Sequence, residues 1–450
     1  MMAAMTALLW LRRDLRLHDL PALLAAHEAG GEVLPVFIAD PALLGSAGPV
    51  RVAHLAAAVT ELNAAYEGAV VVRVGRPEEE VPRLVREVGA GSVHVSREST
   101  PYGRRRDSRV ERALGEVPLV ATGTPYAVGP GLVRKADGEP FQVFTPFSRA
   151  WREHGWPLPA PLPAGLRWHR GVESAPLPWT EPGGVRSGEA SAQARWKEFL
   201  DEDLEGYGEG RDRPDLNVTS QMSVHLKYGT IHPRTMLAEI AAHPAGRTEG
   251  AQRFVTELCW REFYADLLWH RPDSAWADLH DGLRRMAYDD PGSELVRAWE
   301  EGRTGFPFVD AGMRQLLTEG WMHNRVRMVV ASFLVKDLHV WWPHGARYFL
   351  RHLRDGDVAS NNHWWQWVAG TGTDAAPYFR VFNPVSQGER FDPDGDYVRR
   401  YVPELAHILG AEVHQPWRVP DGLAHGYPER IVDHAAERAE ALRRYEEARR

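Results

Sequence analysis

Residues 6–11 read TALLWL and residues 33–39 read VLPVFIA, two short apolar runs of the kind that form buried strands. Three further runs follow, at Ala69–Val74, Val93–Ser96 and Leu119–Thr122. The segments between the runs carry helical patterns, at Arg51–Tyr66, Glu78–Val88 and Arg104–Leu114. Strands that alternate with helices favour a parallel α/β sheet with right-handed crossovers. We therefore predict a Rossmann-like α/β domain at about residues 5–125.

A proline-rich stretch separates this pattern from the rest of the chain. Seven prolines occur in the 26 residues from Pro157 to Pro182. Proline removes a backbone donor and breaks helices, so we expect an extended linker at residues 126–189. From residue 190 to residue 450 the pattern is helical with short loops, which predicts an all-α second domain. Its candidate helices are Ala190–Asp201, Thr248–Leu268, Gly312–Glu319, His323–Leu338, Trp342–Leu353 and Ile431–Arg450.

Length and composition exclude several classes of protein. A chain of 450 residues exceeds the roughly 250–300 at which one core stops growing, so two domains are expected. The net charge of −8 excludes a polycation for nucleic acid, so any DNA contact must be local. The single cysteine, Cys259, excludes a disulfide within the chain, a cysteine zinc site and a four-cysteine iron–sulfur cluster. Neither a membrane-spanning run nor a signal peptide is recognisable, so we expect a cytoplasmic protein without a metal.

The predicted sheet lacks the usual dinucleotide-binding motif, because no GxGxxG follows its strands. Four segments of the helical region instead combine residues suited to binding. The first runs from Tyr207 to Ser223. Hydroxyls at Thr219, Ser220 and Ser223, together with backbone N–H groups at a helix start, suit a phosphate. The alternative is an ordinary helix cap, which the sequence alone favours.

The second segment places Glu257, Trp260 and Tyr264 on one helical face. A carboxylate beside an indole is unusual for a core stripe, because a buried carboxylate must be hydrogen-bonded. The alternative is an amphipathic helix with Glu257 at the solvent boundary. The two interpretations are evenly balanced on the sequence alone.

The third and fourth segments carry polar residues on apolar helices. Asn324, Arg327 and Met328 share one face, opposite an apolar stripe, and they need polar partners if that face is buried. Asp355 is the expected partner of Arg327. Two aspartates, two asparagines and three tryptophans occur between Asp355 and Trp367, which indicates a lined pocket more than a packed core. An exposed polar face and core tryptophans remain the alternatives.

These segments and several longer stretches resemble the photolyase/cryptochrome family, and most closely the class I cyclobutane pyrimidine dimer photolyases. The similarity covers nearly the whole chain. Its most specific stretches are ELCWREFY (257–264), GRTGFPFVDAGMRQL (302–316), EGWMHNRVRM (319–328) and NPVSQGERFDPDGDYVRRYVPEL (383–405).

The resemblance implies a flavin adenine dinucleotide (FAD) bound in the helical domain, which fits the missing glycine motif. Carried over by position, the residues that hold it would be Tyr207, Thr219, Ser220, Gln221, Met222, Ser223, Arg327, Asp355, Asp357 and Asn361. Asn361 would face the flavin N5, where an amide withholds a proton and favours the reduced flavin. The implied activity is light-dependent splitting of cyclobutane pyrimidine dimers by electron transfer from photoexcited reduced FAD to a flipped-out lesion.

The same resemblance implies a lesion pocket, whose residues would be Glu257, Trp260, Asn324, Met328 and Trp367. The two tryptophans would form apolar walls against the dimer. Glu257, in its protonated form, and Asn324 would hydrogen-bond the pyrimidine carbonyls. Asn324 stands where (6-4) photolyases carry a histidine, which favours cyclobutane dimers as the substrate. A photosensory cryptochrome-like flavoprotein without repair activity is the alternative, and the retained lesion-pocket residues count against it.

The remaining implied contacts concern DNA, electron transfer and an antenna. UV-damaged DNA would be the partner of a monomeric protein without an obligate protein partner, and its phosphates would contact Arg211, Arg325, Arg380 and Gln387. Trp365 and Trp342 match the first two members of the family's electron relay. The third position has no tryptophan, so either Tyr288 or Trp341 would end the relay. Arg51, Tyr102 and Lys227 favour 8-hydroxy-5-deazaflavin over methenyltetrahydrofolate, if an antenna is bound.

Overall fold

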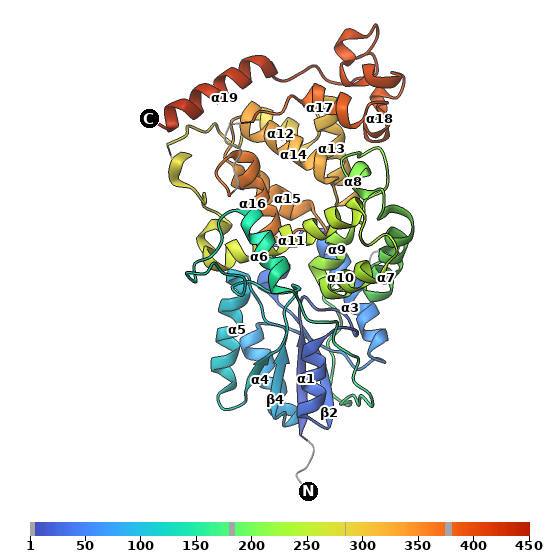
Figure 1. Cartoon of the computed structure of the whole chain (residues 1–450), viewed down its shortest axis with the longest axis vertical. Coiled ribbons are helices and arrows are strands. Elements are labelled where there is room, and N and C mark those ends of the chain that lie inside the picture. The colour runs from blue at the N-terminus through green and yellow to red at the C-terminus, as the bar shows by residue number, and fades with distance from the viewer. Residues whose placement is uncertain (1–4, 180–184, 284, 374–379) are drawn as a thin grey trace. The chain divides into compact units, whose positions relative to one another are not determined.

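The computed structural model describes residues 5–179, 185–283, 285–373 and 380–450 (Figure 1). Packing divides the chain into two compact units. The sheet unit comprises Met1–Phe141, Thr145–Glu205 and Ser220–Pro272, and the helical unit comprises Gln142–Phe144, Gly206–Thr219 and Asp273–Arg450. The predicted domain boundaries follow the change of secondary-structure type and stay a prediction.

The described part of the sheet unit contains five parallel strands in the order β3-β2-β1-β4-β5. They are β1 (Thr6–Leu11), β2 (Glu32–Ala39), β3 (Val71–Val74), β4 (Ser92–Val95) and β5 (Leu119–Ala121). Leu8 of the central strand β1 lies opposite Leu34 of β2 and Val93 of β4. The parallel α/β sheet expected from the apolar runs is therefore confirmed, with strand ends within two residues of those predicted.

Helices cover both faces of the sheet. Those of the sheet unit are α1 (Pro21–Ala29), α2 (Pro41–Leu44), α3 (Pro49–Ala65), α4 (Pro77–Val88), α5 (Pro101–Leu114), α6 (Phe144–His154), α7 (Glu189–Glu198) with the π-helix η1 (Phe199–Asp203), α9 (Met222–Tyr228), α10 (Pro233–Ala242) and α11 (Glu249–His270). Each of α1 to α5 begins with a proline, whose fixed φ suits the first helical turn. Because side chains alternate along a strand, Leu8 and Trp10 of β1 point to the face where α4 and α5 contribute Leu84 and Val110.

The proline-rich linker runs along the open edge of this sheet. The N–H of Val33 in β2 donates to Arg167 O (2.9 Å), and the N–H of His169 donates back to Val33 O (2.9 Å). The N–H of Ala175 donates to Val72 O of β3 (2.9 Å). These bonds satisfy backbone groups that an uncovered edge strand would expose.

The helical unit contains short helices packed around a large apolar core, with a smaller apolar cluster at Leu283, Met286 and Ala448. They are α8 (Tyr207–Gly210), η2 (Pro272–Ala275), η3 (Asp281–Leu283), α12 (Glu294–Glu300), α13 (Pro307–Glu319), α14 (Asn324–Ser332) with the π-helix η4 (Phe333–Asp337), α15 (Trp342–His352), α16 (Val358–Ala369), α17 (Pro384–Phe391), α18 (Asp396–Tyr401), η5 (Pro403–Leu405), η6 (Gly410–His414), η7 (Pro416–Arg418) and α19 (His434–Ala448). The predicted helix His323–Leu338 is thus α14 continued by a π-helix.

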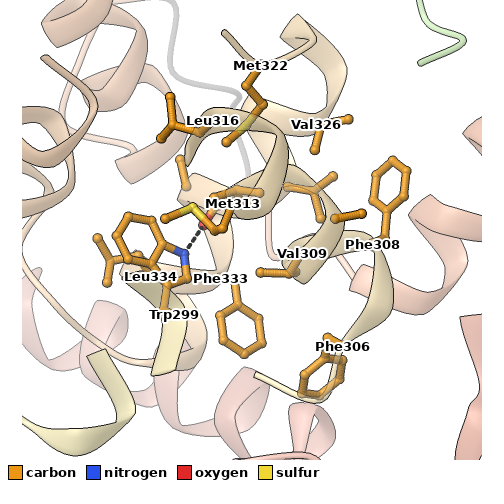
Figure 2. Packing of buried hydrophobic residues seen from close by; sticks show 14 of the residues in the cluster. Trp299, Phe306, Phe308, Val309, Met313, Leu316, Met322, Val326, Phe333 and Leu334 are labelled. Atoms are coloured by element: carbon orange, nitrogen blue, oxygen red, sulfur yellow. Dashed lines mark hydrogen bonds between the residues drawn. The ribbon is translucent and has the colours of Figure 1, made fainter. Parts of the chain in front are cut away.

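Figure 2 shows part of this core, which includes Met313 of α13, Val326 of α14 and Phe333 of the π-helix η4. Trp299 is fully buried, and its indole N–H donates to Val330 O (3.1 Å). Trp342 and Trp365 are also fully buried in this core. Burying a large apolar side chain contributes about 1.5–3 kcal/mol, so these indoles stabilise the unit that carries most of the predicted site. Among the described residues, no helix has the length and apolar character needed to cross a bilayer.

Candidate functional site

A buried ion pair joins α14 to the turn before α16. Arg327 on α14 donates from Nη2 to Asp355 Oδ2 (2.9 Å) and from Nε to Met322 O (2.7 Å). Asp355 is 7% exposed. This is the pair expected from the sequence. The Asp355 carboxylate is buried and the Arg327 side chain is half-buried, so the pair fixes the start of α16 against α14.

Two further polar residues follow on α16. Asp357 is buried and caps the helix, accepting from Ser360 N (3.0 Å). One turn later, the Asn361 amide nitrogen donates to Ala346 O of α15 (3.2 Å) and to Asn362 Oδ1 (2.8 Å). The backbone of α15 therefore orients the Asn361 amide. Together with the ion pair, these residues form a cluster of one cation, two carboxylates and an amide, which we call the α14–α16 polar cluster: Arg327, Asp355, Asp357 and Asn361.

Two arginines predicted to bind DNA share one carboxylate. Asp212 Oδ2 lies 2.8 Å from Arg325 Nη2, and its Oδ1 lies 3.8 Å from Arg211 Nε. Arg325 Nη1 lies 3.4 Å from Met328 Sδ, so the structure brings a predicted DNA contact next to a predicted lesion contact. Arg211 lies over the buried Tyr207 ring (5.8 Å to the centroid). Asp212 was not among the predicted site residues, although it directly follows Arg211.

The other lesion residues of the helical unit lie at its surface or border. Asn324 is exposed at the first position of α14, while Met328 and Trp367 are half-buried. His323 caps α14 by accepting from Arg325 N (3.2 Å), and burial lowers its pKa to about 4, so it is neutral at neutral pH. Met328 and Trp367 therefore present part of their apolar side chains at the surface of this unit.

The remaining two predicted DNA residues flank the start of α17. Arg380 is exposed, and its carbonyl accepts a hydrogen bond from the buried Lys336 Nζ. Burial lowers the pKa of Lys336 to about 7. Gln387 is half-buried on α17, whose cap Asn383 accepts from Val385 N (3.0 Å). The lysine thus anchors the backbone next to Arg380.

The predicted electron relay runs from the core toward the surface. Trp365 and Trp342 are 0% exposed, whereas Trp341 is 40% exposed. The ring centroids of Trp342 and Trp341 lie 6.4 Å apart, and those of Trp341 and Tyr288 also lie 6.4 Å apart. Trp365 packs against Gly345 of α15, where any added Cβ would collide with the indole. The two residues that were alternatives for the end of the relay are therefore neighbours.

In the sheet unit, the second predicted segment lies on α11. Glu257 and Trp260 are half-buried, so they lie at the border between the buried face and the surface of this unit. The Trp260 ring packs against Tyr264 (5.4 Å between centroids) and Phe263 (5.8 Å). These contacts fix the indole on the helix.

The predicted phosphate segment begins α9. Ser220 Oγ accepts from Met222 N (3.3 Å), but the N-cap position of α9 is Gln221, which makes no side-chain cap hydrogen bond. Gln221 has a φ of 54°, in the left-handed region, and Ser223 is exposed. Thr219 belongs to the helical unit and Ser220 to the sheet unit. The phosphate role of this segment stays a prediction.

Of the residues predicted to bind an antenna, Tyr102 lies beside the carboxyl end of β2. Tyr102 on α5 donates to Asp40, the residue that follows β2, and burial raises the Tyr102 pKa to about 12. Arg51 on α3 donates to Ser46 O (2.9 Å), just beyond α2, and burial lowers its pKa. The Arg51 carbonyl accepts from the Tyr228 hydroxyl (3.0 Å), next to the half-buried Lys227. Tyr102 and Arg51 thus contact the two ends of α2, and Arg51 also contacts the residue after Lys227 on α9.

Two carboxylates on α11 were missed by the sequence analysis. Glu262 is buried and accepts backbone N–H groups of Ala127, Val128 and Gly129. Asp266, one turn later, accepts from Gly131 N (2.7 Å), and burial raises its pKa to about 6. They anchor the chain after β5 to α11. Their partners are backbone groups far away in the sequence, so no local pattern marks them.

Comparison with known proteins identifies the family. Residues 7–165 match the family model described as DNA photolyase, and residues 254–447 match the model described as FAD binding domain of DNA photolyase. The chain is 41% identical to a deoxyribodipyrimidine photo-lyase of Streptomyces griseus over 97% of each chain. The chain belongs to the DNA photolyase family.

Solved structures of family members have the same fold. A class III photolyase from Agrobacterium tumefaciens matches with a TM-score of 0.89 at 37% identity, covering 100% of this chain and 98% of that one. A cryptochrome from Synechocystis matches with a TM-score of 0.90 at 26% identity, covering 98% of this chain and 99% of that one. Assignment to class I stays a prediction.

The α14–α16 polar cluster fits a flavin. The matched FAD-binding region, residues 254–447, contains all four of its residues. An isoalloxazine ring presents both donors and acceptors along its edge, and the cluster offers a guanidinium, two carboxylates and an amide in an apolar core. Such a set of few polar groups in an apolar surround is typical of cofactor sites. The residues present therefore suit the cofactor that the family model names.

Proposed function

We propose that this protein repairs cyclobutane pyrimidine dimers in DNA when illuminated, with reduced FAD as the cofactor. The α14–α16 polar cluster is the observation that carries the proposal. It lies in the region that matches the photolyase FAD-binding model, and the relative from S. griseus carries the name deoxyribodipyrimidine photo-lyase. The (6-4) lesion is disfavoured because Asn324, which cannot act as a histidine acid, occupies the corresponding position.

In this proposal the four residues of the cluster hold the isoalloxazine. Arg327 and Asp355 lie beside the ring, Asp357 contacts the cofactor and Asn361 faces N5. Tyr207 and the segment from Thr219 to Ser223 hold the phosphates. Bound reduced FAD would supply one electron to the dimer after absorbing blue or near-UV light. The ion pair keeps the arginine in place, so the site needs little rearrangement when the cofactor binds.

The lesion is recognised outside the duplex. Enzymes that act on bases, photolyases among them, take the target out of the stack, and a damaged pair is the least costly to extrude. Trp260 and Trp367 provide flat apolar walls for the dimer, and Met328 adds a polarisable contact. Glu257 and Asn324 hydrogen-bond the pyrimidine carbonyls. Donors held in place where negative charge develops lower the barrier to ring splitting.

DNA binding is directed at phosphates. Arg211 and Arg325 already lie together around Asp212, so they can neutralise adjacent phosphates as one patch. Arg380 and Gln387 extend the contact along the start of α17. Light and the lesion, rather than base sequence, supply the specificity.

Electron supply and light harvesting complete the proposal. Trp365 and Trp342, followed by Trp341 or Tyr288, would deliver electrons to oxidised FAD, and the 6.4 Å ring spacings support the outer part of this order, from Trp342 to Trp341 and Tyr288. Arg51, Tyr102 and Lys227 bind the antenna, with 8-hydroxy-5-deazaflavin as its chemical class. The absorption spectrum of protein prepared with each antenna identifies the one that is bound.

The proposal is tested with matched lesions. Protein reduced with dithionite is mixed with oligonucleotides that carry either a cyclobutane dimer or a (6-4) photoproduct, and thymine absorbance is followed in light and in the dark. We expect recovery only for the cyclobutane dimer and only in light. Tight FAD binding without recovery of either lesion would support the photosensory alternative and contradict repair.

A further inference from the structure

Asp278 receives two indole N–H groups of the proposed relay. Its Oδ1 lies 2.7 Å from Trp342 Nε1 and 3.3 Å from Trp341 Nε1. The residue is 9% exposed and belongs to the helical unit, in the segment between η2 and η3. One buried carboxylate oxygen therefore binds both outer indoles. Hydrogen bonds from neutral donors to a charged acceptor are about twice as strong as bonds between neutral groups.

The inner indole has a different environment. Trp365 Nε1 is buried and has no acceptor among the residues that the structure describes. Its ring packs against Phe349 (5.0 Å between centroids) in the apolar core. A positive charge on Trp365 would lie among apolar side chains, whereas a positive charge on Trp342 or Trp341 would lie next to a carboxylate. In a medium of low dielectric constant this difference is large.

The segment that carries Asp278 is fixed to α16, the helix of Trp365. Leu279 N donates to Gln366 Oε1 (2.7 Å), and the Gln366 amide nitrogen donates to Ser274 O (2.7 Å). His363 Nδ1 donates to Ala359 O (2.8 Å), so its Nε2 accepts the hydroxyl proton of Ser274 (2.9 Å). The carboxylate is therefore held in position before any charge appears on the relay.

Tyr288 also lies in the field of this carboxylate. Burial raises the pKa of the Tyr288 phenol, and the charge of Asp278 raises it further. The same negative charge that disfavours a phenolate favours a cation on the neighbouring rings. Asp278 therefore faces Trp341, Trp342 and Tyr288 together.

We propose that Asp278 is a positioning residue that draws the positive charge of the relay outward and holds it on Trp342 and Trp341. The inference rests on the proposed function, in which an electron drawn from Trp365 reduces photoexcited oxidised FAD. An electron then passes from Trp342 to the Trp365 radical cation, and another passes from Trp341 to Trp342. No proton moves in these steps. A soluble thiol then gives one electron to the Trp341 radical cation and releases its proton to solvent, and two of the resulting thiyl radicals combine to a disulfide.

The first experiment removes the charge and keeps the acceptor. In FAD-loaded oxidised protein, flash photolysis measures the yield and lifetime of the tryptophan radical. Asp278→Asn keeps an oxygen for the indoles but no charge, so we expect the outer radical to recombine at least tenfold faster. Asp278→Glu keeps the charge and should restore most of the lifetime. Asp289→Asn, which removes an exposed carboxylate near Tyr288, is the matched control and should match wild type.

A lifetime in Asp278→Asn equal to wild type would overturn the proposal. An equal loss in Asp289→Asn would also overturn it, because the effect would then come from net charge alone. If Asp278→Asn fails to fold, Asp278→Glu decides the matter, because its lifetime must lie near wild type.

A second measurement needs no cofactor. In the apoprotein, the indole N–H resonances of Trp341 and Trp342, assigned with Trp→Phe variants, should lie downfield and move upfield in Asp278→Asn. Unmoved resonances would contradict the contact.

Repair by chemically reduced protein bypasses the relay, so Asp278→Asn should repair dimers as wild type does. Absence of repair in both wild type and Asp278→Asn would contradict the proposed function. The radical lifetimes and the indole resonances would still test the role of Asp278.

Discussion

The two units differ in how their buried charged side chains are paired. At the carboxyl ends of β1 and β4, where ligands bind in many α/β sheets, the sheet unit packs its own ion pairs. Arg12 Nη1 lies 2.8 Å from Asp107 Oδ1, and Arg106 binds the same oxygen at 2.8 Å. Burial alone would raise the pKa of Glu98, but Arg13, Arg106 and Arg12 lower it overall. The arginines of this edge are thus engaged with carboxylates of the same unit.

In the helical unit, carboxylates outnumber arginines instead. The α14–α16 polar cluster has one arginine for two carboxylates, and it lies beside an apolar core instead of a sheet edge. This difference favours the helical unit as the place where FAD binds. The sheet unit, which lacks a glycine motif, has ion pairs at the carboxyl ends of β1 and β4, whereas the helical unit provides the polar set that suits a flavin.

The sharpest way to break this comparison is to remove the arginine from each cluster. Arg327→Met leaves Asp355 without its cation, and we expect FAD affinity to fall on the order of 100-fold, because the guanidinium is lost from the cofactor site and a buried carboxylate is left unpaired there. In the matched variant Arg12→Met, Asp107 keeps Arg106, so FAD affinity should stay at the wild-type value. FAD titration of both apoproteins measures the difference. Equal losses would show that the clusters do not differ in role.

A second test concerns catalysis on α11. Glu257→Ala should lower repair per absorbed photon about tenfold or more, because it removes a donor from the site of developing charge. FAD binding should be unchanged. Glu249→Ala, an exposed carboxylate on the same helix, is the control and should repair as wild type does. An unaltered quantum yield in Glu257→Ala would remove this residue from the mechanism.

A smaller effect is expected at the DNA-binding surface. Each neutralised phosphate contributes about one unit to the slope of log affinity against log salt. Arg325→Ala should therefore flatten that slope by about one unit for dimer-containing DNA. Arg297→Ala, an exposed arginine of α12, should leave the slope unchanged. Binding titrations between low and moderate salt distinguish the two variants.

The smallest effect is a pH dependence that both units share. Burial lowers the pKa of His363 in the helical unit and of His232 in the sheet unit to about 4, against about 6.5 for the ordinary side chain. The unfolded chain therefore binds the proton first as pH falls. The stability from each neutral histidine is almost complete at about pH 8, decreases as the pH approaches 6.5 and is lost progressively toward pH 4.

Denaturant titrations test this sign. Each histidine should remove about 0.4 kcal/mol of unfolding free energy between pH 8 and 6.5, rising toward about 1.4 kcal/mol per pH unit below that range. His363→Gln should lose less stability over the same range than wild type, and the exposed His154→Gln should behave as wild type. A steeper loss in His363→Gln would contradict the assigned neutral state.

Sequence reasoning reached the parts of this molecule that local pattern controls. The apolar runs gave strand positions because a strand needs only a few consecutive side chains that suit burial. The Arg327–Asp355 pair was predictable because a charged residue on an apolar helix requires a partner, and the aspartates lay in one nearby turn. Helix α6 was not predicted, because its sequence lies within the expected linker.

The missed residues share another feature. Asp278, Asp212 and Glu262 act on groups far away in the sequence, and their own neighbours give no sign of this. Asp278 acquires its place only when α15 and α16 pack, and Glu262 only when the chain after β5 meets α11. A single sequence records the residue types but not these encounters.

The action spectrum of repair tests the central claim most directly. Reduced, FAD-loaded protein is mixed with a dimer-containing oligonucleotide, and thymine recovery per incident photon is measured at each wavelength. The account predicts a spectrum that follows the absorption of the bound cofactor, with no recovery in the dark. Recovery in the dark, or none at any wavelength absorbed by the cofactor, would contradict it.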